Sequence, residues 1–181
     1  MILLTTSLRP TRRIRSFCSD IQRVLPNIAR VSRGKLALDA LAEKALELKA
    51  NGVVVVDRWR GEPSKITLHN VTSKGLETFF PILFIANVKL QLDYGQIYKP
   101  VGKVAVSFSN GLSEEARRIV ERISNFFHLP ILNMNADPRK IDASLNFSPQ
   151  LGYIVKASFT HPPVVREVGP SFTIKTVVWN P

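Results

Sequence analysis

The sequence contains one cysteine, three histidines and no long apolar run, and each of these shortages excludes a class of protein. A single cysteine, Cys18, rules out an internal disulfide framework and a cysteine-rich zinc site. A membrane-spanning helix needs about 18 or more consecutive apolar residues, which the chain lacks. The opening Met1–Leu4 segment turns polar too early for a secretory signal. Because the histidines are far apart and lack ligand-like spacing, we expect no metal site and no cofactor.

Acidic residues are also scarce, which leaves the chain with an excess of positive charge. The 181 residues are 45% hydrophobic and 22% charged, a composition typical of a soluble globular chain of one domain or two small ones. Against 14 acidic residues stand 25 Lys and Arg, so the formal net charge is +11. Such an excess favours a polyanionic partner, with nucleic acid ahead of a membrane surface. We expect a nucleic acid, with no membrane and no small-molecule substrate.

The positive charge is concentrated at the start of the chain. Residues 1–35 carry about two thirds of the net charge and contain a single acid, Asp20. Their basic residues are Arg9, Arg12, Arg13, Arg15, Arg23, Arg30, Arg33 and Lys35. Arginine presents a rigid fork of donors that matches phosphate oxygens and stacks on bases better than lysine does. The alternative interpretation is an ordinary solvated face of a helix.

Hydrophobic periodicity predicts an α/β fold. Helices are expected over Thr11–Leu25, Leu36–Ala50 and Ser113–Phe127, and Cys18 falls on the apolar stripe of the first, as a core residue. We expect a connection over residues 70–77 and irregular or briefly helical chain over 137–149. The expected strands are Met1–Thr6, Asn27–Val31, Val53–Val56, Ile66–His69, Ile82–Leu92, Lys103–Phe108, Ile131–Met134, Gly152–Phe159 and Phe172–Trp179.

A shift of 102 residues brings the first strand and helix onto the middle of the chain without a gap. Ile2 then falls on Val104 and Thr11 on Ser113, and the apolar stripes of the two helices coincide. This pattern predicts two similar halves built from a duplicated strand–helix–strand unit. Their approximate limits are 1–77, basic and RNA-binding, and 78–181, which supplies scaffold.

The two copies differ at the start of the helix, where Arg12 and Arg13 are replaced by Glu114 and Glu115. A helix N-terminus is partly positive, so basic residues there cost roughly 0.3–1 kcal/mol each. Bound phosphates would reverse that cost. A local rule broken in one copy and obeyed in the other indicates function. We therefore predict an RNA-binding site made of Thr5, Thr6, Ser7, Arg9, Arg12, Arg13, Arg15, Arg30, Arg33 and Lys35.

Two further segments allow more than one interpretation. The turn Ser32–Lys35 lacks the first glycine of a nucleotide phosphate loop, and Leu36 stands where Ser or Thr would hold magnesium. It is therefore either a contact to an RNA backbone or a plain basic turn. Trp59, between Arg58 and Arg60, either stacks on an unpaired base or covers the edge of a sheet.

The chain resembles the Brix-domain family of ribosome-biogenesis proteins, in particular its archaeal, small-subunit-processome-like members. The resemblance rests on Thr5–Phe17, Leu25–Asn27, Ser32–Leu36 and Val168–Phe172, which span nearly the whole chain. It implies a single domain over 1–181, in which each half is like the anticodon-binding domain of class IIa aminoacyl-tRNA synthetases. The family often has Gly-Pro-Arg-Phe near its end. Ser171 takes the arginine position here, which weakens the case for a C-terminal RNA contact.

The resemblance also implies a non-catalytic factor that binds ribosomal RNA or its precursor during rRNA processing and subunit assembly. Its partners would include other ribosome-assembly proteins, and its place would be the cytoplasm, or the nucleolus in a eukaryote. The long charged tails of eukaryotic relatives are missing, so the chain looks like the bare domain. Three alternatives stay open: a protein–protein adaptor with a basic docking face, an RNA-processing enzyme, and a general RNA- or DNA-binding module.

Overall fold

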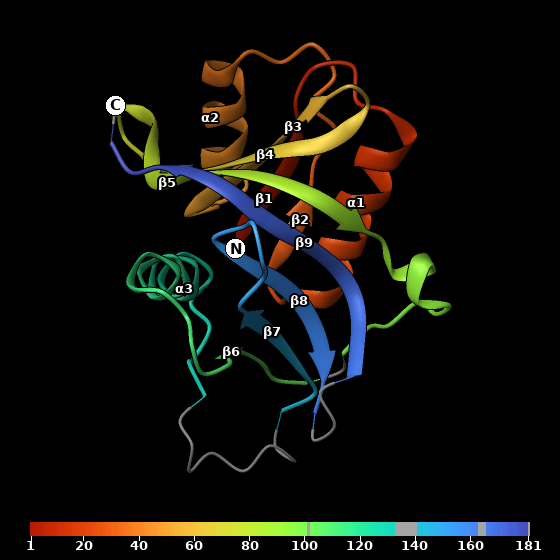
Figure 1. The fold of residues 1–181 in the computed structure, drawn as a ribbon. Coiled ribbons are helices and arrows are strands. Elements are labelled where there is room, and N and C mark those ends of the chain that lie inside the picture. The colour runs from red at the N-terminus through yellow and green to blue at the C-terminus, as the bar shows by residue number, and fades with distance from the viewer. Residues whose placement is uncertain (101, 133–140, 163–165, 181) are drawn as a thin grey trace.

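The computed structural model describes residues 1–100, 102–132, 141–162 and 166–180 (Figure 1). One mixed sheet contains nine strands in the order β2-β1-β3-β4-β5-β9-β8-β7-β6. The helices are α1 (Arg12–Val24), α2 (Leu38–Glu47), the short 3-10 helix η1 (Gln91–Tyr94) and α3 (Glu114–Phe127). The strands are β1 (Ile2–Thr6), β2 (Ile28–Arg30), β3 (Gly52–Trp59), β4 (Glu62–Thr72), β5 (Gly75–Lys89), β6 (Val104–Phe108), β7 (Ala143–Ser148), β8 (Val155–His161) and β9 (Arg166–Val178).

Both long helices pack on the same face of the curled sheet. Phe17 of α1 and Ile119 of α3 are fully buried in a single hydrophobic core that also receives Leu4 of β1 and Leu145 of β7. Successive residues of a strand point to opposite faces, so Leu3 lies on the other side, where it packs with Leu41 of α2. One core therefore holds the two halves of the chain together.

The predicted apolar stripes of the first and third helices are confirmed. In α1 the buried apolar residues recur at helical spacing, and the same spacing recurs in α3. The buried apolar residues are Ile14, Phe17, Cys18, Ile21 and Val24 in α1, and Ala116, Ile119, Val120, Ile123 and Phe126 in α3.

The two halves of the sheet share one order of connections. In the first half β1 lies parallel to β2 and β3, and β3, β4 and β5 follow as antiparallel neighbours. In the second, β6 lies parallel to β7 and to a bridge at Ile131, and β7, β8 and β9 follow as antiparallel neighbours. β5 and β9 pair at the centre. Within the residues that the structure describes, α2 has no counterpart.

This shared order agrees with the 102-residue shift, since β1 and β6 begin at Ile2 and Val104. The helix caps match as well: the hydroxyls of Thr11 and Ser113 each accept a hydrogen bond from the backbone N–H three residues later. The duplication itself stays a prediction. The predicted boundary between residues 77 and 78 falls inside β5.

Three sequence predictions were wrong about local structure. The connection expected over residues 70–77 is a tight turn between Thr72 and Gly75, because β4 and β5 extend toward each other as a long hairpin. The segment expected to be irregular contains β7, whose apolar residues alternate with polar ones. α2 is shorter than expected. Of the strand expected over Ile131–Met134, Ile131 forms an isolated bridge to Val106 and Leu132 belongs to no strand. Residues 133–134, and residues 137–140 of the expected irregular segment, lie outside the described residues.

The outer edges of the sheet are short. On one side the last strand is β2, with three residues. On the other side is β6, whose Val106 exchanges backbone hydrogen bonds with Pro130 and Leu132 on its outward side. In the ranges that the structure describes, no helix is long and apolar enough to cross a membrane.

Cys18 provides a test of this packing. Its side chain is fully buried in the core, and this burial raises the pKa of the thiol to about 12. Since the thiolate is the reactive form, we expect Ellman's reagent to leave the native protein unlabelled at pH 8 and to label it at once after denaturation. Rapid labelling of the native protein would show that α1 does not pack as described.

Candidate nucleic-acid interface

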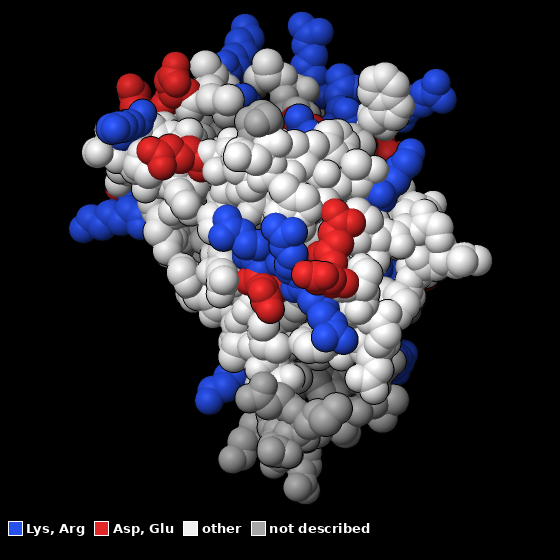
Figure 2. All heavy atoms as spheres, turned by 60° about the vertical axis from the view of Figure 1, so that its left-hand side comes forward, with Lys and Arg blue, Asp and Glu red and all other residues white. Residues whose placement is uncertain are grey.

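The parallel strands β1, β2 and β3 end on the same side of the molecule. Three separate segments follow these ends: the loop into α1, the loop into α2, and the turn between β3 and β4. Figure 2 shows several Lys and Arg side chains projecting from the upper end of the molecule, where Figure 1 places these segments. In open α/β sheets, ligands bind at the carboxyl ends of the parallel strands. This end is therefore the candidate site.

A shallow groove with a volume of about 660 Å³ lies at this end, and we call it the basic groove. It is lined by Ser7, Leu8, Arg33, Asp57, Arg58, Trp59, Arg60 and Lys65. The only acidic side chain in this lining, Asp57, is paired with Lys65 at 2.8 Å. Arg33 donates its Nε–H to the carbonyl of Leu36 at 3.0 Å, which fixes the loop before α2. The guanidinium groups of Arg33, Arg58 and Arg60 have no carboxylate partner among the described residues.

The turn between β3 and β4 carries an arginine in an unfavourable backbone conformation. Trp59 pairs with Glu62, so the turn consists of Arg60 and Gly61, and both have positive φ, 51° and 89°. Two-residue hairpin turns of this kind favour Asn or Gly at the first position. For a residue such as arginine the left-handed conformation costs roughly 1–2 kcal/mol. Strained backbone of this kind is over-represented at functional sites.

Thr11 joins the start of α1 to this turn. Its hydroxyl accepts a hydrogen bond from the N–H of Ile14 and donates one to the carbonyl of Gly61 at 2.7 Å. The helix N-terminus and the turn therefore meet, and Arg12, the first residue of α1, lies next to the turn that carries Arg60.

A second group of arginines continues from the basic groove along the exposed face of α1. Arg12 and Arg15 are exposed one turn apart. Arg30, from β2, donates to the hydroxyl of Ser19, and that hydroxyl donates to the carbonyl of Arg15 at 2.9 Å. We call Arg12, Arg15 and Arg30 the basic stripe. None of the three has a carboxylate within ion-pair distance in the part of the chain that the structure describes.

The remaining predicted site residues are divided between the surface and the interior. Arg9 and Lys35 are exposed in the loops that precede α1 and α2. Thr5 and Thr6 are buried in β1, and Thr5 donates its hydroxyl to the carbonyl of Val31 at 2.9 Å, so the Thr5 hydroxyl is already used within the fold. Ser7 lines the basic groove, but its Oγ is buried and has no hydrogen-bond partner among the described residues.

Arg13 has a structural role that the sequence did not predict. Its Nε lies 2.5 Å from a carboxylate oxygen of Glu62, and its Nη2 donates to the carbonyl of Val88 at 2.8 Å. Asp93 adds a carboxylate at 3.9 Å. The side chain thus ties α1 to β4, to β5 and to η1. Two of its five N–H donors are used within the fold in this way, and its contact with RNA stays a prediction.

The matching end of the second half has the opposite character. A groove of about 480 Å³ lies at the start of α3, and its lining contains Glu115 but no Lys or Arg. Leu151, in the turn between β7 and β8, is 95% exposed beside it. The charge difference between the two helix starts therefore extends to the grooves beside them.

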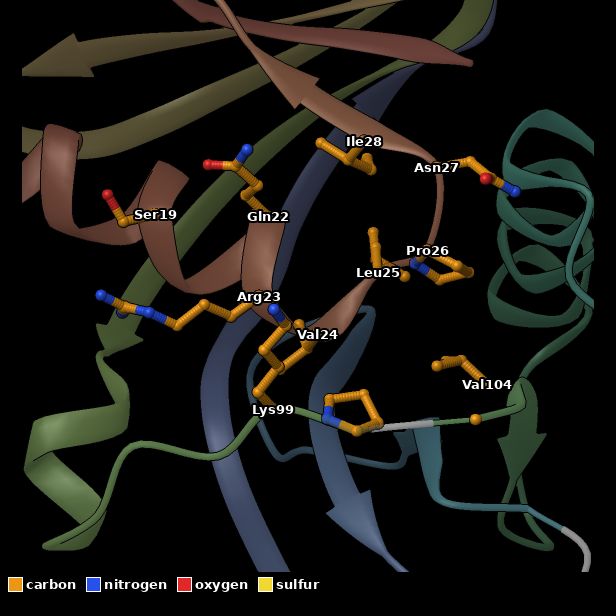
Figure 3. Close-up of a pocket in the computed structure, with 12 residues that line it drawn as sticks. Ser19, Gln22, Arg23, Val24, Leu25, Pro26, Asn27, Ile28, Lys99 and Val104 are labelled. Carbon is orange, nitrogen blue, oxygen red and sulfur yellow. The ribbon is translucent and has the colours of Figure 1, made fainter.

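A separate pocket of about 510 Å³ lies between the end of α1 and Lys99, Pro100, Gly102 and Val104 (Figure 3). Two basic side chains line it, Arg23 and Lys99. Arg23 is paired at 2.6 Å with the buried Asp20, which also accepts the N–H of Gln91 at 2.9 Å. Burial raises the pKa of Asp20. Because Arg23 compensates an internal carboxylate, this pocket offers an anion fewer free donors than the basic groove does.

Six residues of the basic groove were not among the predicted site residues: Leu8, Asp57, Arg58, Trp59, Arg60 and Lys65. The sequence does contain a signal for three of them, namely a tryptophan flanked by arginines within a turn. Lys65 carries no such signal, since its place in the groove depends on the pairing of β4 with β3.

The different roles of Arg12 and Arg13 lead to a prediction about stability. Arg12→Gln should leave the free energy of unfolding unchanged or raise it by roughly 0.3–1 kcal/mol, because a positive charge leaves the helix N-terminus. Arg13→Gln should lower it by about 1 kcal/mol, a value reduced for the partial exposure of the Arg13–Glu62 pair. Urea denaturation of both variants measures the difference. Equal effects of the two substitutions on the free energy of unfolding would contradict these roles. A double-mutant cycle of Arg13→Gln with Glu62→Gln gives the coupling energy of the Arg13–Glu62 pair.

Comparison with known proteins places this geometry in context. No family model matches the chain. A probable Brix domain-containing ribosomal biogenesis protein of Pyrococcus horikoshii is 37% identical over 95 residues, which cover 52% of this chain and 42% of that protein. The match therefore spans less than half of the relative's length.

Two solved structures share the fold over almost the whole chain. A probable ribosomal biogenesis protein from Aeropyrum pernix K1 superposes with a TM-score of 0.76 at 20% identity, covering 99% of this chain and 96% of that one. Mil, an archaeal Imp4-like protein, superposes with a TM-score of 0.69, also at 20% identity, covering 98% and 99%. The resemblance predicted from the sequence is thus confirmed, and this chain is a homologue of the archaeal proteins named Brix domain-containing ribosomal biogenesis proteins.

Proposed function

We propose that this protein is a non-catalytic ribosome-biogenesis factor that binds ribosomal RNA or its precursor through the basic groove and the basic stripe. The observation that carries the proposal is the cluster of arginines at the end of the first half, in the absence of carboxylate partners among the described residues. The names of its homologues supply the setting of ribosome assembly.

Electrostatics explains why a polyanion fits this end. Arg12 stands at the positive end of α1 and has no compensating acid in the first turn. A phosphate bound there would receive donors from the arginine and from free backbone N–H groups of the helix start, and it would remove the repulsion. Arg15 and Arg30 extend the same positive surface along the helix. The unfavourable energy of the positive charge at the start of α1 is then offset only when RNA is bound.

Contacts to phosphates position an RNA without reading its sequence. The selectivity of this surface would come from the shape of the RNA or from its unpaired bases. The groove at the matching end of the second half contains no Lys or Arg in its lining, so we assign the second half the scaffold and a docking surface for other assembly proteins. The expected place of action is the cytoplasm, or the nucleolus if the source is eukaryotic.

We infer that the halves derive from one duplicated unit, since their strands connect in the same order and their helix caps correspond. The likeness of each half to the anticodon-binding domain of class IIa aminoacyl-tRNA synthetases would then describe the ancestral unit. Superposing β1–β5 on β6–β9, and each on such a domain, tests both statements.

The competing functions make different predictions. For a protein–protein adaptor, Arg12→Glu with Arg15→Glu would abolish partner capture but leave RNA affinity unchanged. An RNA-processing enzyme would cleave precursor ribosomal RNA in the presence of a divalent metal. A general nucleic-acid binder would show equal affinity for matched RNA and DNA fragments. Our proposal predicts loss of RNA affinity, no cleavage and a preference for RNA.

The salt dependence of binding tests the phosphate contacts. If about five phosphates of a single strand are neutralised, log affinity should fall against log salt concentration with a slope near −3.5. Arg15→Gln should reduce that slope by about 0.7. Its matched control is Arg117→Gln, at the equivalent position of α3, which should leave the slope unchanged. Fluorescence anisotropy at several salt concentrations gives these slopes, and a salt-insensitive affinity rules out the mechanism.

Arg60 should show a conflict between stability and binding. Arg60→Asn places a residue that tolerates positive φ in the turn, so we expect the free energy of unfolding to rise by up to about 1 kcal/mol. RNA affinity should fall at the same time, because a guanidinium of the basic groove is lost. Thermal melting and RNA titration of the same preparation measure the two effects. A variant that is more stable and binds RNA as well as before would remove Arg60 from the site.

A further inference from the structure

The two tryptophans of the protein have opposite surroundings. Trp179, just after β9, is half-buried: the guanidinium of Arg118 lies 4.2 Å from its ring centroid, and its Nε1–H donates to Glu115 at 3.1 Å. Trp59 is 69% exposed. Among the described residues, no aromatic ring or cation covers it. An indole this exposed covers little of the sheet, which favours the interpretation in which it stacks on an unpaired base.

The structure holds Trp59 in this exposed position. Between Asp57 and Arg58 the pairing of β3 with β4 shifts register, so that Arg58 lies opposite Pro63 and Ser64 is the extra residue. Bulges of this kind change the direction of the side chains that follow. The turn beyond Trp59 is fixed by the hydrogen bond from Thr11 to Gly61. The hairpin that carries the indole of Trp59 is thus held in place by its contact with Thr11.

The surroundings of Trp59 combine an apolar surface with positive charge. Leu8, which is 52% exposed, lies in the same groove, as do Arg33, Arg58 and Arg60. Single strands of nucleic acid are bound by this combination, in which bases stack on aromatic rings and phosphates meet basic side chains. A purely electrostatic contact with a duplex backbone would have no use for an exposed indole.

We propose that the basic groove takes a single-stranded segment of RNA, with one unpaired base stacked on the indole of Trp59 and the flanking phosphates held by Arg33, Arg58 and Arg60. This inference rests on the proposed RNA-binding function and specifies its substrate: a loop, bulge or end of the RNA. In a duplex, bases are stacked on their neighbours, and their faces do not reach a side chain on the protein surface. The groove therefore discriminates single strands from duplexes, while the basic stripe holds phosphates of either.

Trp59 can be observed directly. Trp179→Phe leaves Trp59 as the only tryptophan, so its fluorescence reports on that position alone. We expect an oligoadenylate of about ten nucleotides to quench this emission. An oligonucleotide of the same length with abasic sites in place of the bases should bind through its phosphates without quenching. A blunt RNA duplex should likewise bind with little quenching.

Substitutions separate stacking from charge. Trp59→Ala should weaken binding of the oligoadenylate about 5- to 100-fold, the range that loss of one base–aromatic stack produces. It should change the affinity for the abasic strand and the duplex by less than twofold. Trp59→Phe should keep part of the affinity. Because Trp59 is exposed, both variants should melt at the temperature of the parent protein.

The outcomes distinguish this inference from the function on which it rests. Salt-dependent binding of all three RNAs, without quenching and without an effect of Trp59→Ala on the oligoadenylate, would overturn the stacking and leave the phosphate contacts standing. If none of the RNAs binds, the proposed function itself fails. If an acidic protein fragment binds the basic groove and RNA does not, the groove is a protein-docking site and the inference is wrong.

Discussion

The antiparallel pairing of β5 with β9 is the constraint on which the rest of this structure depends. It joins two sets of strands into one sheet, and α1 and α3 then share a single core on one face. Within the first half, β1 pairs in parallel with β2 and β3, so the carboxyl ends of these three strands lie together. The basic groove exists because of that arrangement, since Leu8, Arg33 and Trp59 come from three segments that are far apart in the chain.

The first half accepts several unfavourable local features at that end. Arg12 stands at a helix N-terminus without an acid in the first turn, and Arg60 has a backbone conformation that suits Asn or Gly. The second half has Glu114 and Glu115 at the matching helix start. Arg13 shows that sequence position alone does not reveal the purpose of a charge, because its guanidinium stabilises the junction of α1 with β4 and β5. Arg12, which has no carboxylate partner among the described residues, and Arg13, which stabilises the fold, are therefore neighbours in the first turn of α1.

Much of the scaffold could be predicted from the sequence, because a helix that packs on one face repeats its apolar residues every three or four positions. Phe17 and Ile119 were placed correctly for that reason. β7 also carries a signal, the alternation of Ala143, Leu145 and Phe147 with polar residues, but it is short and follows a charged loop. The site was less predictable. Thr5 donates inward to Val31 and Lys65 reaches the basic groove through strand pairing, and both facts depend on contacts between distant segments.

The short edges of the sheet have a consequence for the behaviour of many copies together. A long open edge offers a row of free backbone donors and acceptors onto which another chain can add a strand. Here β2 exposes only three residues, and the outward side of β6 is already engaged by Pro130 and Leu132. Within the described residues, the two edges therefore leave few free backbone groups on which a second molecule could add a strand.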